Sequence, residues 1–209
     1  MQSMLNIKYM ECIVINGSPI GIGKINFDLT EEERKNILNL RYIKKIEHNN
    51  PLVSEDSSIF KDKKLERIQN VMFDCVEEYK DKILQIKNKL RLVHSWSTIN
   101  NNTNHKLHAH KNSLISCSFY LESEGKNKII FKVGKSTLEK CHYLDYDIKE
   151  YNAFNSENWT INIDKGMIVI FLSDLEHESI NEGKKIMLGS NYFITGKLGK
   201  QEKYTYLEI

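Results

Sequence analysis

The sequence predicts an α+β chain whose C-terminal half forms a β-sandwich or a β-barrel. Up to position 90, apolar residues recur at helical spacing, which indicates helices. Beyond it, short runs rich in β-branched and aromatic residues indicate strands, and turn residues separate them. Helices followed by many closely spaced strands are typical of such a fold. The runs are LRLVHSWSTI (90–99), LISCSFYL (114–121), KIIFKV (128–133), WTINI (159–163), GMIVIFL (166–172) and KIMLGSNYFIT (185–195).

Two further strands are expected at the N-terminus. Asn16-Gly17 is a typical hairpin turn, and it separates the apolar runs 10–15 and 21–27. We therefore expect a short antiparallel hairpin ahead of the helices.

The N-terminal helices have clear start signals and apolar faces. Thr30 and Glu33 have the spacing of a capping box, and three apolar residues follow at helical spacing: Ile37, Leu40 and Ile43. Residues 47–60 read as a polar loop. A second helix over 61–90 is expected to pack its apolar stripe on the outer sheet. That stripe consists of Leu65, Ile68, Met72, Cys75, Tyr79, Ile83 and Ile86.

The composition indicates a globular protein with a full core and no strong electrostatic field. Hydrophobic residues make up 40% of the 209 residues, and 30 basic residues nearly balance 28 acidic ones. The net charge of +2 gives no basic surface for nucleic acid or an acidic membrane. We expect one domain over 1–209, in which 1–90 supports a β core at 91–199.

The expected location is the cytoplasm. Residues near the N-terminus include no apolar run of the length found in signal peptides, and no stretch approaches the length of a membrane span. The four cysteines, Cys12, Cys75, Cys117 and Cys141, are scattered without a CxxC pair, so we expect reduced thiols.

Three of the seven histidines fall in the stretch HKLHAHKNSLISCSFYL (105–121). If this stretch is extended, His108 and His110 leave the same face of a sheet and can share one ion. His177 follows the buried strand 166–172 and can deliver a third ligand. Solvated loop histidines and a turn histidine at 177 are the alternative interpretations.

Other polar residues are expected near these histidines. Tyr120 lies an even number of residues from His108 and His110, so an unbroken strand places it on the same face, together with Ser116 and Ser118. Lys185 begins the last core strand and faces either the barrel or, as one of a Lys184-Lys185 pair, the solvent. The same alternation points Cys117 away from Tyr120, and Trp96 and Trp159 are expected in the core.

Four blocks of the chain, over roughly 50–199, resemble the Fe(II)- and 2-oxoglutarate-dependent oxygenases. The resemblance is closest to members described in marine phages and bacteria. It implies a double-stranded β-helix, that is, a jelly-roll or cupin-like barrel. The blocks are HSWST (94–98), HKLHAHKNSLISCSFYL (105–121), FNSENWTINIDKGMIVIFLSDLEH (154–177) and KIMLGSNYFITGKLG (185–199).

The resemblance implies roles for individual residues. His108 and His177 match iron ligands, and His110 matches the third ligand, where most of the superfamily has aspartate. His105 is an alternative ligand or a supporting residue. Lys185 matches the arginine that binds the far carboxylate of 2-oxoglutarate, and Tyr120 matches a tyrosine that often assists. Met187 replaces an assisting serine or threonine.

The activity implied is that of a dioxygenase that hydroxylates a C–H bond and releases succinate and CO2. A small molecule, an amino acid or a peptide is the expected substrate, and the protein is expected to be a monomer or homodimer. Loops at 47–60, 134–157 and 196–209 would contact the substrate. Two alternatives stay open. One is a cupin-type metalloprotein with three histidines that does not use 2-oxoglutarate, and the other is a barrel that serves only as a binding module.

Overall fold

The computed structural model describes residues 7–15, 17–45, 51–132, 134, 146–152 and 155–209, with side chains from residue 17 onward. Asn16, the side chain of Cys12, Cys141 and parts of the loops 47–60 and 134–157 lie outside the described residues. Both described cysteines, Cys75 and Cys117, are free thiols.

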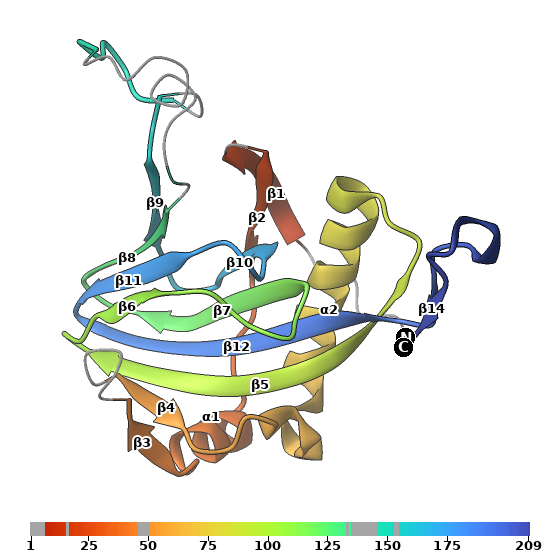
Figure 1. Cartoon of the computed structure of the whole chain (residues 1–209). Helices are drawn as coiled ribbons and strands as arrows, with labels where there is room; N and C mark the ends of the chain where they lie inside the picture. The colour runs from red at the N-terminus through yellow and green to blue at the C-terminus, as the bar shows by residue number, and fades with distance from the viewer. Residues whose placement is uncertain (1–6, 16, 46–50, 133, 135–145, 153–154) are drawn as a thin grey trace.

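Two antiparallel sheets face each other and form a barrel (Figure 1). The larger sheet has the strand order β1-β2-β10-β7-β12-β5-β4-β3, and the smaller has the order β6-β11-β8-β9. From β5 to β12 the chain passes repeatedly between the two sheets, as in a double-stranded β-helix. The predicted fold class is therefore confirmed.

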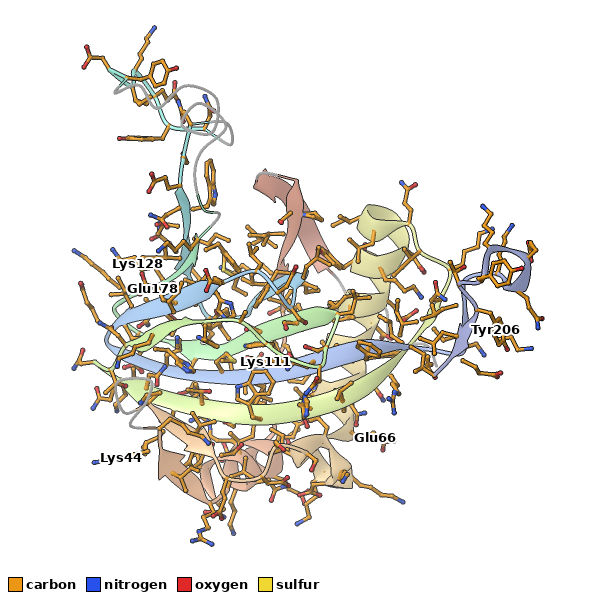
Figure 2. The ribbon with its side chains drawn as sticks, in the orientation of Figure 1. Lys44, Glu66, Lys111, Lys128, Glu178 and Tyr206 are labelled. Atoms are coloured by element: carbon orange, nitrogen blue, oxygen red, sulfur yellow. The ribbon has the colours of Figure 1, made fainter. Side chains whose placement is uncertain are left out.

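The larger sheet consists of β1 (Ile7–Ile15), β2 (Ser18–Ile25), β3 (Tyr42–Lys44), β4 (Leu52–Ser54), β5 (Lys89–Asn101), β7 (Ile115–Ser123), β10 (Met167–Leu172) and β12 (Lys184–Thr195). The smaller sheet consists of β6 (His105–His108), β8 (Lys126–Lys132), β9 (Asn158–Ile163) and β11 (His177–Glu182). A two-stranded hairpin, β13 (Lys197–Leu198) and β14 (Leu207–Glu208), follows the barrel. Figure 2 shows Tyr206 on this hairpin, and Lys128 and Glu178 beside each other at the smaller sheet.

Apolar side chains cover both faces of the larger sheet. On the outer face, α2 (Glu66–Tyr79) buries Ile68, Met72 and Cys75 against Cys117 and its neighbours, as predicted. On the inner face, Tyr120 packs with residues of both sheets, so Cys117 and Tyr120 point in opposite directions as expected. The inner cluster is Ile20, Tyr120, Ile129, Phe131, Ile161, Ile163, Val169, Phe171 and Leu175.

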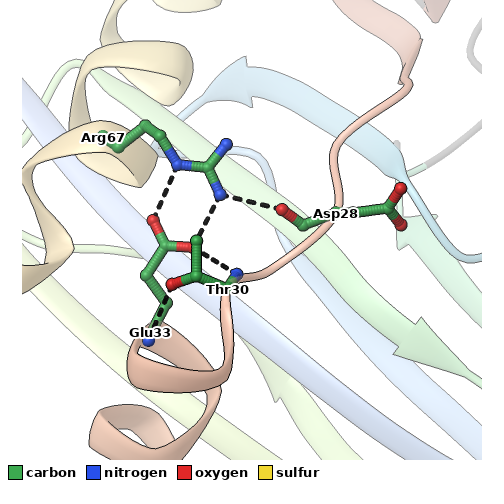
Figure 3. A network of polar contacts seen from close by, with 4 residues as sticks. All are labelled: Asp28, Thr30, Glu33 and Arg67. Carbon is green, nitrogen blue, oxygen red and sulfur yellow. Dashed lines mark hydrogen bonds and ion pairs between the residues drawn. The ribbon is translucent and has the colours of Figure 1, made fainter.

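The capping box at the first helix is confirmed, and it also joins the two helices (Figure 3). Thr30 caps α1 (Glu31–Leu38), and Glu33 binds the backbone of Thr30 in return. The guanidinium of Arg67, on α2, donates to both carboxylate oxygens of Glu33 at 2.9 and 2.6 Å. Burial opposes ionisation of Glu33, but the hydrogen bonds from Arg67 and Thr30 outweigh it and lower the pKa of Glu33. The pair therefore fixes α1 against α2.

Two helix boundaries differ from the prediction. The first helix ends at Leu38, and Ile43 lies in β3, where it pairs with Val53. The long helix ends at Tyr79 and continues as a π-helical turn, Lys80–Leu84, before Gln85 adopts a left-handed φ of 54°. The apolar stripe misled the prediction because Ile83 and Leu84 still pack on the same core after the α-helix has ended.

The predicted polar loop 47–60 is partly structured, because Leu52–Ser54 form β4 and Ile59–Lys61 a 3₁₀ turn. Strand β11 was not predicted as a strand. Within the described part of the chain, none of the helices has the length and apolarity needed to cross a membrane.

Candidate metal centre

Three histidines converge at the open end of the barrel. His108 ends β6 and His177 begins β11, and the two residues lie directly opposite each other in the β6–β11 pair. His110 lies in the turn after β6, and its backbone N–H donates to the Ser173 carbonyl at 2.8 Å. One ligand atom of each ring lies within 4.8 Å of the others. The structure thus brings together the three histidines that the sequence indicated.

Hydrogen bonds to backbone carbonyls orient two of the rings in the same way. The Nδ1 atom of His108 lies 2.7 Å from the Lys106 carbonyl, and that of His177 lies 3.0 Å from the Leu175 carbonyl. A carbonyl oxygen only accepts, so each Nδ1 carries the proton and the lone pair of each ring lies on Nε2. A bond of this kind from the second ring nitrogen is typical of histidines that bind metals.

His110 is held by a polar network inside the barrel. Its Nδ1 lies 2.7 Å from the Ser116 hydroxyl and 2.9 Å from the Asn191 amide oxygen. The Ser116 hydroxyl also donates to that amide oxygen and lies 2.8 Å from the Ser173 hydroxyl. The sequence analysis placed Ser116 on this face but missed Asn191 and Ser173, which come from distant parts of the chain.

The predicted extended run from the histidines to Tyr120 is interrupted. Strand β6 stops at His108, and Asn112 has a left-handed φ of 57° in the turn before β7. His110 therefore reaches the site from a turn and not from the strand. Tyr120 nevertheless faces the site, because β7 restores the inward direction after the turn.

Burial disfavours the charged form of two of these rings. Burial, and then the neighbouring His108, lower the pKa of His110 to about 4. The same causes lower the pKa of His177 well below its usual value. Three imidazoles are a good donor set for iron, zinc, nickel or copper ions. No described aspartate or glutamate joins the group, so the residues fit a divalent transition metal without the usual carboxylate.

His105 lies beside the group without joining it. Its ring stacks on that of His108, with centroids 4.3 Å apart. The three-histidine group does not include it. We therefore interpret His105 as a support for His108.

A pocket extends from the three histidines toward β12. Lys185 lies at its far side, 2% exposed, and forms no ion pair with any described residue. Burial lowers its pKa to about 7, and its Nζ lies 5.5 Å from the centre of the Tyr120 ring. The solvent-exposed interpretation of Lys185 is wrong, although it holds for Lys184. The pocket is lined by Trp96, His105, His108, His110, Ser118, Tyr120, Ile129, His177, Ser179, Lys185 and Met187.

The two tryptophans differ in position. Trp159 packs against the inner core as expected. Trp96 instead lines the pocket, with its ring centroid 5.3 Å from that of His110, so its assignment to the core is wrong. Gly189 makes room for it, since a Cβ there would lie 2.3 Å from the Trp96 ring.

The fold and this site together define a double-stranded β-helix whose pocket holds three histidines that could bind a metal ion and a buried lysine. Residues 94–186 match the family described as "Putative 2OG-Fe(II) oxygenase". The predicted resemblance to the Fe(II)- and 2-oxoglutarate-dependent oxygenases is thereby confirmed, and the family match indicates an enzyme. The narrower resemblance to phage and marine bacterial members stays a prediction.

Solved structures support the same fold. A carbocyclase, SnoK, described as non-heme and alpha-ketoglutarate-dependent, matches with a TM-score of 0.57 and 10% identity, over 88% of this chain and 84% of that one. HygX from Streptomyces hygroscopicus, solved with nickel and 2-oxoglutarate, matches with a TM-score of 0.53 and 11% identity, over 83% and 82%. A 2OG-Fe(II) oxygenase family member from Burkholderia pseudomallei gives 0.51 and 11%, over 80% and 79%. A comparison with curated proteins found no match.

Proposed function

We propose that this protein is a dioxygenase that depends on Fe(II) and 2-oxoglutarate and hydroxylates a C–H bond of its substrate. His108, His110 and His177 would hold the iron through their Nε2 atoms. Lys185 and Tyr120 would bind the co-substrate. The observation that carries the proposal is that three imidazoles and a buried lysine without an ion pair in the described residues line one pocket.

The chemistry follows from this arrangement. When bound, iron and 2-oxoglutarate would supply the activation of dioxygen, by which one oxygen atom enters the substrate and the other enters succinate, with loss of CO2. The chain's own residues position the reactants. Carbonyls of Lys106 and Leu175 fix two ligand rings, and the Lys185 ammonium attracts the carboxylate farthest from the iron. A lysine binds that carboxylate as a point charge, without the two-pronged geometry of arginine.

The partners and location belong to the same proposal. The substrate is a small molecule, an amino acid or a peptide, and nucleic acid is not expected at a net charge of +2. We propose a cytoplasmic monomer or homodimer that folds as one domain, with 1–90 supporting the barrel at 91–199.

A second candidate is a metalloenzyme of the cupin type that does not use 2-oxoglutarate. The observation in its favour is the absence of a carboxylate from the ligand group in the described residues. The buried Lys185 argues against it, because a bound carboxylate would stabilise the charged form of a lysine that is buried without an ion pair.

The test is an anaerobic titration of the metal-free protein, first with Fe(II) and then with 2-oxoglutarate. We expect a weak visible charge-transfer absorption on addition of 2-oxoglutarate, and its loss in His108→Ala and His177→Ala. Lys185→Ala should bind iron but give the absorption only at much higher 2-oxoglutarate concentration, whereas Lys184→Ala, at the adjacent exposed position, should behave as wild type.

The outcomes separate the candidates. Iron binding without any effect of 2-oxoglutarate would favour the cupin-type alternative. A protein that binds no iron would be a binding module, and the proposal would be wrong.

A further inference from the structure

Strand β5 turns a row of side chains toward the pocket. In the β5–β12 pair, Asn100 lies directly opposite Lys185 and Thr98 directly opposite Met187. Residues directly opposite each other point to the same face, with Cβ atoms about 5 Å apart. Since Lys185 and Met187 line the pocket, Thr98 and Asn100 face the same interior.

Both of these residues are buried polar groups with a missing partner. Thr98 is 0% exposed and its hydroxyl has no hydrogen-bond partner among the described residues. Asn100 is 1% exposed and its amide nitrogen likewise has none. Burying such a group without a partner costs stability, so each such atom requires an explanation, such as a bound ligand or an ordered water.

The other face of β5 shows that this strand otherwise satisfies its polar groups. The Ser95 hydroxyl accepts from the Phe60 backbone at 3.0 Å. The Ser97 hydroxyl accepts from the Tyr42 hydroxyl at 2.8 Å. Among these four residues of β5, the two without a hydrogen-bond partner for a donor are the two on the pocket side.

Charge indicates what would occupy this place. Lys185 brings a buried cation without an ion pair in the described residues, and Met187 beside it offers no donor. A carboxylate accepts several hydrogen bonds, more than one ammonium group supplies in good geometry. A hydroxyl and an amide nitrogen on the adjacent strand are the additional donors that a bound carboxylate needs.

We propose that Thr98 and Asn100 donate hydrogen bonds to the far carboxylate of the 2-oxo acid bound by Lys185. This inference rests on the proposed function. Through these two residues, β5 favours the binding of a 2-oxo acid with two carboxylates over one with a single carboxylate. Met187 has no hydrogen to donate to this carboxylate. The hydroxyl of Thr98, directly opposite Met187 on β5, donates in its place.

The test compares the binding of 2-oxoglutarate and of pyruvate, which lacks the far carboxylate, to the anaerobic Fe(II) protein by calorimetry. Thr98→Val keeps the shape of the side chain and removes the hydroxyl. We expect it to raise the Kd for 2-oxoglutarate about tenfold, and that for pyruvate less than twofold, because one hydrogen bond to a charged group is lost. Asn100→Leu should act in the same direction. Thr98→Ser keeps a hydroxyl and should bind 2-oxoglutarate about as tightly as the wild type. Ser97→Ala, on the opposite face of β5, is the matched control and should leave both Kd values unchanged.

A second readout does not depend on the ligand. Because the Thr98 hydroxyl is unsatisfied in the free protein, Thr98→Val should unfold at the same or a higher temperature than wild type without ligand. Weaker 2-oxoglutarate binding by a variant that is at least as stable would support the inference.

Two results would overturn the inference, and they are distinguishable. If wild type binds 2-oxoglutarate and both variants bind it equally well, β5 has no such role while the proposed function stands. If wild type binds iron but not 2-oxoglutarate, the proposed function fails, and the inference fails with it.

Discussion

His108 and His177 lie directly opposite each other across the β6–β11 pair, with ring centroids 4.4 Å apart. The two strands belong to the smaller sheet, whereas Asn191, which holds His110, belongs to the larger one. The candidate metal site is therefore built from both sheets. Its geometry depends on the closure of the barrel as well as on the ligands themselves.

This dependence predicts an effect of Asn191 on metal binding. Asn191→Ala removes the amide oxygen that lies 2.9 Å from the Nδ1 of His110, so the ring loses part of its orientation. Loss of such a supporting group typically lowers metal affinity about 10- to 100-fold. Competition with a chelator would measure the change for Fe(II) or Zn(II). Asn162→Ala, at an exposed position of β9, should leave the affinity unchanged, and an equal loss in both variants would contradict the role of Asn191.

The stability of the metal-free protein is expected to rise with pH in the alkaline range. The pKa of Lys185 is about 7 in the folded protein, against an ordinary value of 10.5. Between these values the unfolded chain holds a proton that the folded protein does not, so the free energy of unfolding increases as the pH rises. Each unit of the shift corresponds to about 1.4 kcal/mol.

Thermal unfolding of Lys185→Met tests this expectation. The variant should be more stable than wild type at neutral pH, because burial of the charged lysine destabilises the wild type. The difference in the free energy of unfolding should shrink toward pH 10. Lys184→Met should show no such trend, since Lys184 is exposed. A difference that is constant over the whole pH range would contradict the buried, poorly protonated state of Lys185.

The same residue predicts that 2-oxoglutarate binding takes up a proton. Its carboxylate pairs with the charged form of Lys185, which becomes scarce above pH 7. The Kd should therefore rise as the pH rises above about 7, by up to about tenfold per unit. Calorimetry at pH 8.5 in buffers of different ionisation enthalpy would count the protons. Uptake near zero there would mean that Lys185 is already charged without ligand.

The sequence was informative where the structure follows apolar patterns. The runs that became β5, β7, β8, β9, β10 and β12 carry β-branched and aromatic residues, and the capping box marked α1. Strand β11 was missed because its inward residues are polar. These are His177, Ser179 and Asn181, and all three are buried. A strand that lines a polar site lacks the alternation by which strands are recognised.

The candidate site shows the same limit. The three histidines and Lys185 could be found because their residue types carry the chemistry. The residues that hold them could not, because Ser173 and Asn191 meet Ser116 only after the barrel closes. The place of Trp96 was also missed, since an aromatic residue in a strand is typical of a core and its position over Gly189 is a tertiary contact.

That contact gives a last prediction. In Gly189→Ala the new methyl group would lie 2.3 Å from the Trp96 ring, so the ring must move, and its edge contact with His110 must change. We expect a loss of about 1–3 kcal/mol in the free energy of unfolding, as for other overpacked interiors, together with weaker metal binding. Denaturant unfolding and metal titration would measure both effects. In a Trp96→Ala background, Gly189→Ala should cost little stability, because the methyl group then has room. If Gly189→Ala costs as much stability in that background as in the wild type, the clash lies elsewhere and Trp96 does not link Gly189 to the metal centre.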